Sequence, residues 1–134
     1  MLKTLTSLGF EALVGLVLGY LAGRFIGWWS LPIVTAISSF YFKTSVGKAF
    51  AAGTAAGTLL WLLYSGILNF ANGGQLSGML AETFHLTSGA YLMNITVLIG
   101  GLLGGMGALC GALARNVILD VTSQAAPRLV PVLI

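Results

Sequence analysis

Charged residues are scarce in this sequence. Only 7% of its 134 residues are Asp, Glu, Lys or Arg, whereas soluble domains carry about 25%. Hydrophobic residues make up 57% of the chain, and its mean hydropathy is +0.99. A chain of this composition belongs in a lipid bilayer, where helices need not bury all their apolar surface. We expect an all-α membrane protein that forms a single integral membrane domain over residues 1–134.

Groups that could carry chemistry are also few. The chain contains one His and three acidic residues, and none of them belongs to a recognisable set of nucleophile, base and orienting group. Glu82 and His85 stand three residues apart, as in half of a carboxylate-bridged metal site, but the other half is missing. The six basic residues are spread singly, so no patch favours nucleic acid. We expect neither catalysis nor a cofactor or bound metal.

The chain has a single cysteine, Cys110. One cysteine excludes an intrachain disulfide and a cysteine-based metal cage. Because Cys110 lies in an apolar, glycine-rich run, we expect it to be a small core residue.

Two long stretches contain no charged residue. They predict membrane-spanning helices over residues 49–70 and 90–114, each long enough to cross about 30 Å of hydrocarbon at 1.5 Å per residue. The second is followed by Arg115 and by a cytoplasmic tail, residues 116–134, for which the sequence predicts no structure.

The first helix has to tolerate a charge. Glu11 and Arg24 bracket only twelve uncharged residues, which cover about 18 Å as a helix. We expect a helix over residues 5–25, in which Arg24 extends toward the headgroups and Glu11 is buried or lies near the opposite headgroups. Lys3 resembles the basic region of a signal peptide, but Glu11 interrupts the apolar stretch and no A-x-A cleavage site follows. The first helix should therefore be retained.

A second, shorter helix is predicted over residues 30–44. Ser30 could cap its N-terminus, and Pro32 would fall in the first turn, where a missing N–H is harmless. Trp28 and Trp29, which precede it, fit a membrane–water interface. The helix is short for a crossing, so a re-entrant segment is the alternative.

Four crossings would place most of the basic residues on one side of the membrane. One side would hold Lys3, Lys43, Lys48, Arg115 and Arg128, and the other only Arg24. The positive-inside rule then predicts cytoplasmic termini and an external loop over residues 71–89. A three-crossing alternative splits the charges less cleanly. Within the loop, residues 76–86 predict an interfacial helix with an apolar face and a polar face.

Glycine is the strongest patterned signal, because it recurs at helical spacing in three of the predicted helices. The positions are Gly15, Gly19, Gly23, Gly27, Gly53, Gly57, Gly100, Gly104, Gly107 and Gly111. In lipid, such small-residue faces mark close contacts between helices. Some of these contacts lie inside one chain, and we expect others to join chains in a homo-oligomer or to join the chain to other membrane subunits.

Glu11 and Asn94 are the candidate ion or proton site. A carboxylate inside a membrane is costly and by default indicates an ion or proton pathway. With Lys3 eight residues earlier, however, Glu11 could instead stay hydrated at the cytoplasmic headgroups. Asn94 is more typical of a hydrogen bond between helices than of a solute ligand.

Several short motifs allow a comparison with known families. They are Trp28-Trp29, Gly47-Lys48-Ala49-Phe50 leading into Trp61, and the pairs Gly100-Gly101 and Gly104-Gly105 before Arg115. With these motifs the chain resembles a group of small bacterial inner-membrane proteins of unknown function. The resemblance implies an inner-membrane location and no particular activity.

Two functions remain as hypotheses. The leading one is a non-catalytic membrane protein that acts through glycine-mediated packing, as a homo-oligomer or an accessory subunit. The alternative is a small channel or proton-coupled transporter that uses Glu11. The position of Glu11 discriminates between them, because a polar cavity at the carboxylate favours transport and a place among the headgroups favours packing.

Overall fold

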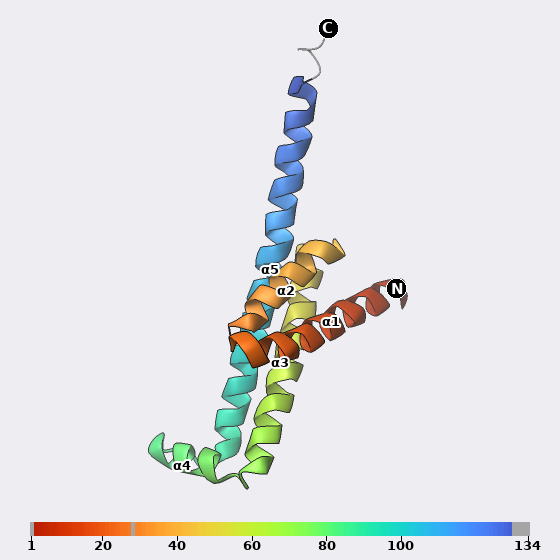
Figure 1. The fold of residues 1–134 in the computed structure, drawn as a ribbon. Helices are drawn as coiled ribbons and strands as arrows, with labels where there is room; N and C mark the ends of the chain where they lie inside the picture. Colours follow the sequence, from red (N-terminus) through yellow and green to blue (C-terminus); the bar gives the residue numbers. More distant parts are fainter. Residues whose placement is uncertain (1, 28, 130–134) are drawn as a thin grey trace.

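The fold is all-helical, as predicted. A computed structural model describes residues 2–27 and 29–129, with side chains described for residues 6, 8–25, 27 and 29–124. Trp28, predicted to be an interface anchor, lies outside the described residues. The described part contains no strand, and its helices are α1 (Leu2–Ile26), α2 (Ser30–Phe42), α3 (Val46–Ala71), α4 (Gln75–Thr83) and α5 (Gly89–Leu129) (Figure 1).

Three of the described helices are long and apolar enough to cross a membrane. Their apolar windows are Leu8–Phe25 in α1, Val46–Ala71 in α3 and Gly89–Gln124 in α5. The 13 residues of α2 extend only about 20 Å, which is short of the hydrocarbon thickness. These lengths and compositions indicate a helical membrane protein.

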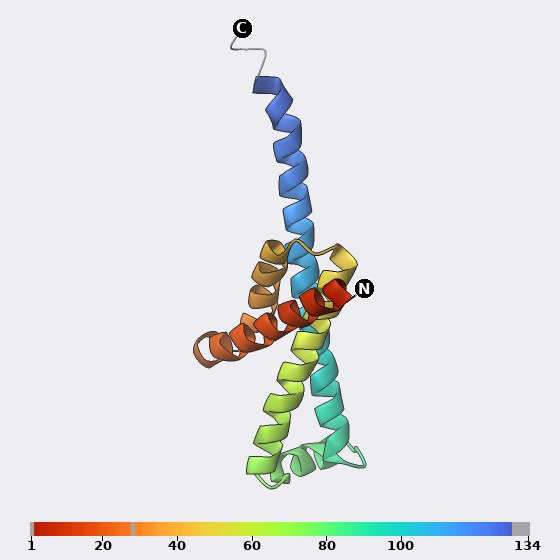
Figure 2. The same ribbon diagram turned by 90° about the vertical axis from the view of Figure 1, so that its right-hand side faces the viewer.

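The long helices α3 and α5 form an antiparallel pair that lies side by side in both views (Figures 1 and 2). Helices α1 and α2 form a hairpin that crosses this pair obliquely, and α1 packs on α2 and α3. Helix α2 packs mainly on α5. The C-terminal part of α5 extends well beyond this bundle (Figure 2).

Glycines bring the backbones of α3 and α5 into contact. A Cβ atom on Gly53 would collide with the carbonyl oxygen of Gly104, and one on Gly57 would collide with that of Gly100. Such close approach increases the packing contact that holds helices together in lipid. Small residues extend the contact toward the start of α3, where the fully buried side chains are Ala49, Ala108 and Ala112.

The glycine face of α5 packs on two helices, first on α3 and further along on α2. After the contact with α3, Gly107 lies against Pro32 of α2, and Gly111 lies against the backbone of Ala36. On α1, a Cβ at Gly15 would lie 3.3 Å from Cβ of Ala56 in α3. All these contacts are made within one chain.

Gly27 departs from the predicted glycine pattern. Helix α1 ends at Ile26, and Gly27 has a φ of +81°, with nothing within 4 Å of the place of a Cβ. Its role is therefore to turn the chain from α1 into α2, because glycine adopts positive φ without steric cost. Gly23 is half-buried and faces Ser30, whose Oγ would lie 3.6 Å from an added Cβ.

Helix α5 continues past Arg115, where the sequence predicts no structure. A charged residue ends an apolar run, but it does not interrupt the backbone hydrogen bonds of a helix. The helix therefore runs on to Leu129. In this projecting part Val117, Ile118 and Val121 are exposed.

Two further predictions are wrong. Cys110 is exposed rather than in the core, because the glycines on either side of it, Gly107 and Gly111, take the face that contacts α2. Ser30 does not cap α2: it is the first residue of the helix, and the cap position, Trp29, makes no capping side-chain hydrogen bond.

Helix α4 is shorter than the predicted 76–86 and ends at Thr83, two residues before His85, which has a positive φ of 54°. It lies across the end of the α3–α5 pair (Figure 1). Its Ser77 hydroxyl donates a 2.6 Å hydrogen bond to Asn69 Oδ1 of α3. The larger apolar side chains of this segment, including Met79 and Phe84, are exposed.

Candidate functional site

Glu11 lies inside the bundle and not at its surface. Only 3% of the residue is exposed. It precedes Gly15 by four residues and therefore shares the face of α1 that packs on α3. The same register that buries Gly15 and Gly19 against α3 thus carries the carboxylate inward.

Two hydroxyl groups bind the carboxylate. Ser39 Oγ, from the last turn of α2, donates to Glu11 Oε1 at 2.7 Å, and Thr44 Oγ1 donates to Glu11 Oε2 at 3.0 Å. Thr44 follows Lys43, which ends α2 in the left-handed conformation with a φ of 53°. This turn brings the α2–α3 connection back over α1, so that each carboxylate oxygen receives one hydrogen bond.

The guanidinium group of Arg115 lies on the other side of Thr44 from the Glu11 carboxylate. Arg115 Nη2 of α5 donates to the backbone carbonyl of Thr44 at 2.9 Å and also approaches Asn116 Oδ1 at 3.3 Å. Its Nη1 is buried and has no hydrogen-bond partner within the described part of the chain. Thr44 therefore separates two opposite charges: its hydroxyl binds Glu11, and its carbonyl binds Arg115.

A small void adjoins the carboxylate. Its volume is about 10 Å³, which is close to the space that one water molecule needs. Thr35 and Ser38 line it together with Glu11 and Ser39. The hydroxyls of Thr35 and Ser38 donate to carbonyls of their own helix, at 3.0 Å and 2.9 Å, so their oxygen lone pairs remain available. Small residues complete the lining: Gly15, Ala52, Gly53, Ala56 and Ala108.

This cluster of oxygens defines the chemistry open to the site. A carboxylate and several hydroxyl oxygens form a set of acceptors that suits a proton or a small hard cation. Among the side chains described for residues 6, 8–25, 27 and 29–124, no Lys or Arg makes an ion pair with Glu11. An ionised Glu11 would thus have only hydroxyl donors as direct partners in a bundle that otherwise consists of apolar and small residues.

The structure does not bring the other predicted site residues to Glu11. Asn94 is exposed and precedes Ala108, which lines the void, by about 21 Å of helix. Arg24 lies near the other end of α1. Glu82 and His85 are both exposed, and within the described part of the chain no three of His, Cys, Asp or Glu come together as a metal site.

Sequence reasoning missed the partners of Glu11. Thr35, Ser38 and Ser39 are spaced as neighbours on one helical face, and this polar stripe in a short apolar helix was the available signal. No comparable signal marks Thr44, because its position depends on the turn at Lys43. Arg115 was interpreted as the end of a membrane span and as a cytoplasmic charge, and not as a neighbour of Glu11.

No family model, no curated protein and no solved structure matches the chain.

Proposed function

We propose that the protein is a small membrane transporter or channel in which Glu11 binds and releases a proton or a monovalent cation. The observation that carries this proposal is the burial of the Glu11 carboxylate among hydroxyl groups, beside a small void and without an ion pair to any described side chain. Buried ionisable groups in membrane segments are costly and generally serve ion or proton pathways.

The glycine faces no longer favour assembly over transport. The closest glycine contacts, at Gly53, Gly57, Gly107 and Gly111, join helices of the same chain. The glycine pattern is thus accounted for without a second copy. The buried carboxylate, in contrast, is costly in a membrane helix and indicates an ion or proton pathway.

The cluster supports a simple exchange at the carboxylate. When Glu11 is neutral, it needs little compensation inside the bundle. When it loses its proton, the negative charge attracts either a cation that enters the void or Arg115, whose Nη1 lacks a partner. Because Arg115 already binds the carbonyl of Thr44, a change of charge at Glu11 acts directly on the contact between α5 and the α2–α3 connection.

The proposal includes a topology. The membrane would be crossed four times, in alternating directions, by α1, α2, α3 and α5. Helix α2 would be a short crossing that is completed by its flanking turns. Helix α4 would lie at the outer interface. The link from Arg115 to Thr44 supports it, because this link joins the ends of the predicted cytoplasmic segments. Both termini would then be cytoplasmic, in the bacterial inner membrane that the sequence resemblance implies.

Flux measurements in proteoliposomes test the function. Wild type, Glu11→Gln and Glu82→Gln are reconstituted side by side, and the movement of protons, Na⁺ and K⁺ is followed under an imposed membrane potential. Glutamine keeps the shape and hydrogen-bonding capacity of Glu11 but cannot ionise. Glu82, which is exposed on α4, provides the matched control.

We expect wild type and Glu82→Gln to conduct alike, and Glu11→Gln to fall to the level of empty liposomes. A wild type that moves none of the three ions faster than empty liposomes would refute the proposal. So would a Glu11→Gln variant that keeps full flux.

Assembly into a homo-oligomer or a larger membrane complex is a second candidate function, and a different observation favours it. The apolar side chains of Val117, Ile118 and Val121 lie on the part of α5 that projects from the bundle. A homo-oligomer or a larger membrane complex would cover them. Light scattering of wild type and Val117→Ser/Val121→Ser in mild detergent tests this, since the variant should lose subunits if this face holds the assembly together.

A further inference from the structure

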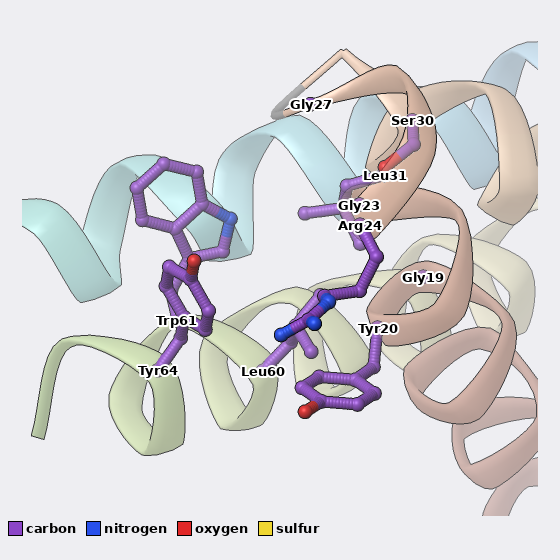
Figure 3. A pocket seen from close by; sticks show the side chains of 10 residues that line it. All are labelled: Gly19, Tyr20, Gly23, Arg24, Gly27, Ser30, Leu31, Leu60, Trp61 and Tyr64. Carbon is purple, nitrogen blue, oxygen red and sulfur yellow. The ribbon is translucent and has the colours of Figure 1, made fainter. Parts of the chain in front are cut away.

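A second cavity lies between α1, the start of α2 and α3, separate from the Glu11 cluster. Its volume is about 200 Å³, and Figure 3 shows its lining. The glycines of α1 leave it open, because Gly19, Gly23 and Gly27 contribute no side chain on this side. The function proposed for Glu11 does not involve this cavity.

Arg24 and Trp61 supply this cavity with hydrogen-bond donors. The guanidinium of Arg24 extends into it from α1, and the indole nitrogen of Trp61 faces the α1 side from α3 (Figure 3). Both groups can only donate hydrogen bonds. No acidic residue lines the cavity, and within the described part of the chain Arg24 makes no ion pair or hydrogen bond.

Ser30 adds a second polar group that is already built into the cavity wall. Only 2% of the residue is exposed, and it lines the cavity together with Arg24. Its Oγ lies close to Gly23, 3.6 Å from the place of an added Cβ. The hydroxyl can therefore donate a hydrogen bond to a ligand that binds beside Arg24.

The remaining wall is apolar and aromatic. Leu31 and Leu60 line its inner side, whereas Tyr20 and Tyr64 are about half exposed and flank the side that faces the bilayer. A ligand that enters from the bilayer would therefore meet apolar surface as well as the donors. This combination matches an amphiphile with an anionic head.

We propose that this cavity binds an anionic phospholipid, whose phosphate accepts hydrogen bonds from Arg24 and Ser30 while an acyl chain lies along Tyr20 and Leu60. Charge complementarity carries the assignment. A guanidinium on an apolar membrane helix needs a counter-charge, phosphate is its preferred bidentate acceptor, and none of the described carboxylates reaches it. Basic pockets between membrane helices are a general mode of lipid headgroup binding.

Lipid titration by native mass spectrometry tests this site. The protein is delipidated in mild detergent and titrated with phosphatidylglycerol or, as the zwitterionic comparison, phosphatidylcholine. The variants are Arg24→Gln and Ser30→Ala, and the matched control is Lys48→Gln, which removes one positive charge from an exposed position outside the cavity. Circular dichroism verifies that each variant keeps its helices.

We expect wild type and Lys48→Gln to bind phosphatidylglycerol in preference to phosphatidylcholine. Arg24→Gln loses a charge-assisted hydrogen bond to the phosphate, which should weaken lipid binding about ten-fold or more. Ser30→Ala loses a neutral hydrogen bond, which should weaken lipid binding about a few-fold. Equal affinity for the two lipids, or unchanged binding by Arg24→Gln, would overturn the proposal. Displacement of the lipid by millimolar inorganic phosphate would overturn the lipid assignment and identify a site for the free anion.

Discussion

The hydroxyl of Ser39 lies 2.7 Å from a carboxylate oxygen of Glu11, and only 1% and 3% of the two residues are exposed. This hydrogen bond joins α2 to α1 across 28 positions of sequence. In the absence of water it supplies one of the two donors that the carboxylate receives. Each partner therefore depends on the other for its hydrogen bond.

Ser39→Ala should destabilise the bundle. The substitution leaves a buried carboxylate oxygen without its donor, which costs about 1–3 kcal/mol. The unfolding free energy in detergent, measured by denaturant titration, should fall by that amount. Ser45→Ala is the control, because Ser45 is exposed and its side chain makes no capping hydrogen bond. Equal stability of the two variants would mean that Glu11 does not need this donor.

Gly53→Ala should also destabilise, whereas Gly66→Ala should not. A methyl group at Gly53 collides with the backbone of Gly104, and such overpacking costs about 1–3 kcal/mol. At Gly66 nothing lies within 4 Å of an added Cβ, so alanine should stabilise the helix by about 0.5–1 kcal/mol. Thermal unfolding in detergent should give shifts of opposite sign, and shifts of the same sign would contradict the α3–α5 contact.

Arg115→Ala should loosen the connection between α2 and α3. The variant loses the hydrogen bond from the guanidinium to the Thr44 carbonyl, and bonds to charged groups contribute about 1.5–3 kcal/mol. Amide hydrogen exchange in residues 43–46 should become about ten-fold faster. Asp120→Ala, an exposed change on the same helix, should leave that exchange as in wild type. Unchanged exchange in Arg115→Ala would show that the turn is rigid by itself.

The proposed topology predicts which thiols a membrane-impermeant reagent reaches in intact cells. Cys110 is exposed on α5, so it is first replaced by alanine. Single cysteines are then placed at Thr87 and Ser123, which are both exposed. The positive-inside rule predicts labelling at Thr87 and none at Ser123 until the cells are opened. The reverse pattern would invert the topology.

The three span candidates were predictable from the sequence, because the length and hydropathy of a segment largely decide whether it can cross a bilayer. The helix ends were less predictable. Arg115 ends the apolar run but not α5, and no pattern in residues 116–129 predicted the helix that follows it. Pro127, which would normally discourage a helix, lies within the last turn of α5.

The orientation of side chains was harder to predict than helices. Glu11 stands four residues before Gly15, so helical register alone assigns it to the packed face, whereas the sequence interpretation left open whether it is buried or hydrated near the headgroups. Cys110 was assigned to the core, and its exposure shows that this assignment is wrong. It belongs with Met106 and Leu113, which share one helical face and are exposed, although Ala108, Gly111 and Ala112 nearby in the sequence are small and buried. In both cases the register was more informative than the local composition.

The order of synthesis gives the long-range link between Thr44 and Arg115 a further meaning. The two residues are 71 positions apart, and chains emerge from the ribosome with the N-terminal part first. Helices α1, α2 and α3 are therefore made before α5, while Gly53 and Gly57 still lack their opposing backbone and the Thr44 carbonyl still lacks its donor. Insertion of α5 supplies both at once. The hydrogen bond from Arg115 thus acts as a completion step, which closes the carboxylate cluster only after the last of these helices has been made.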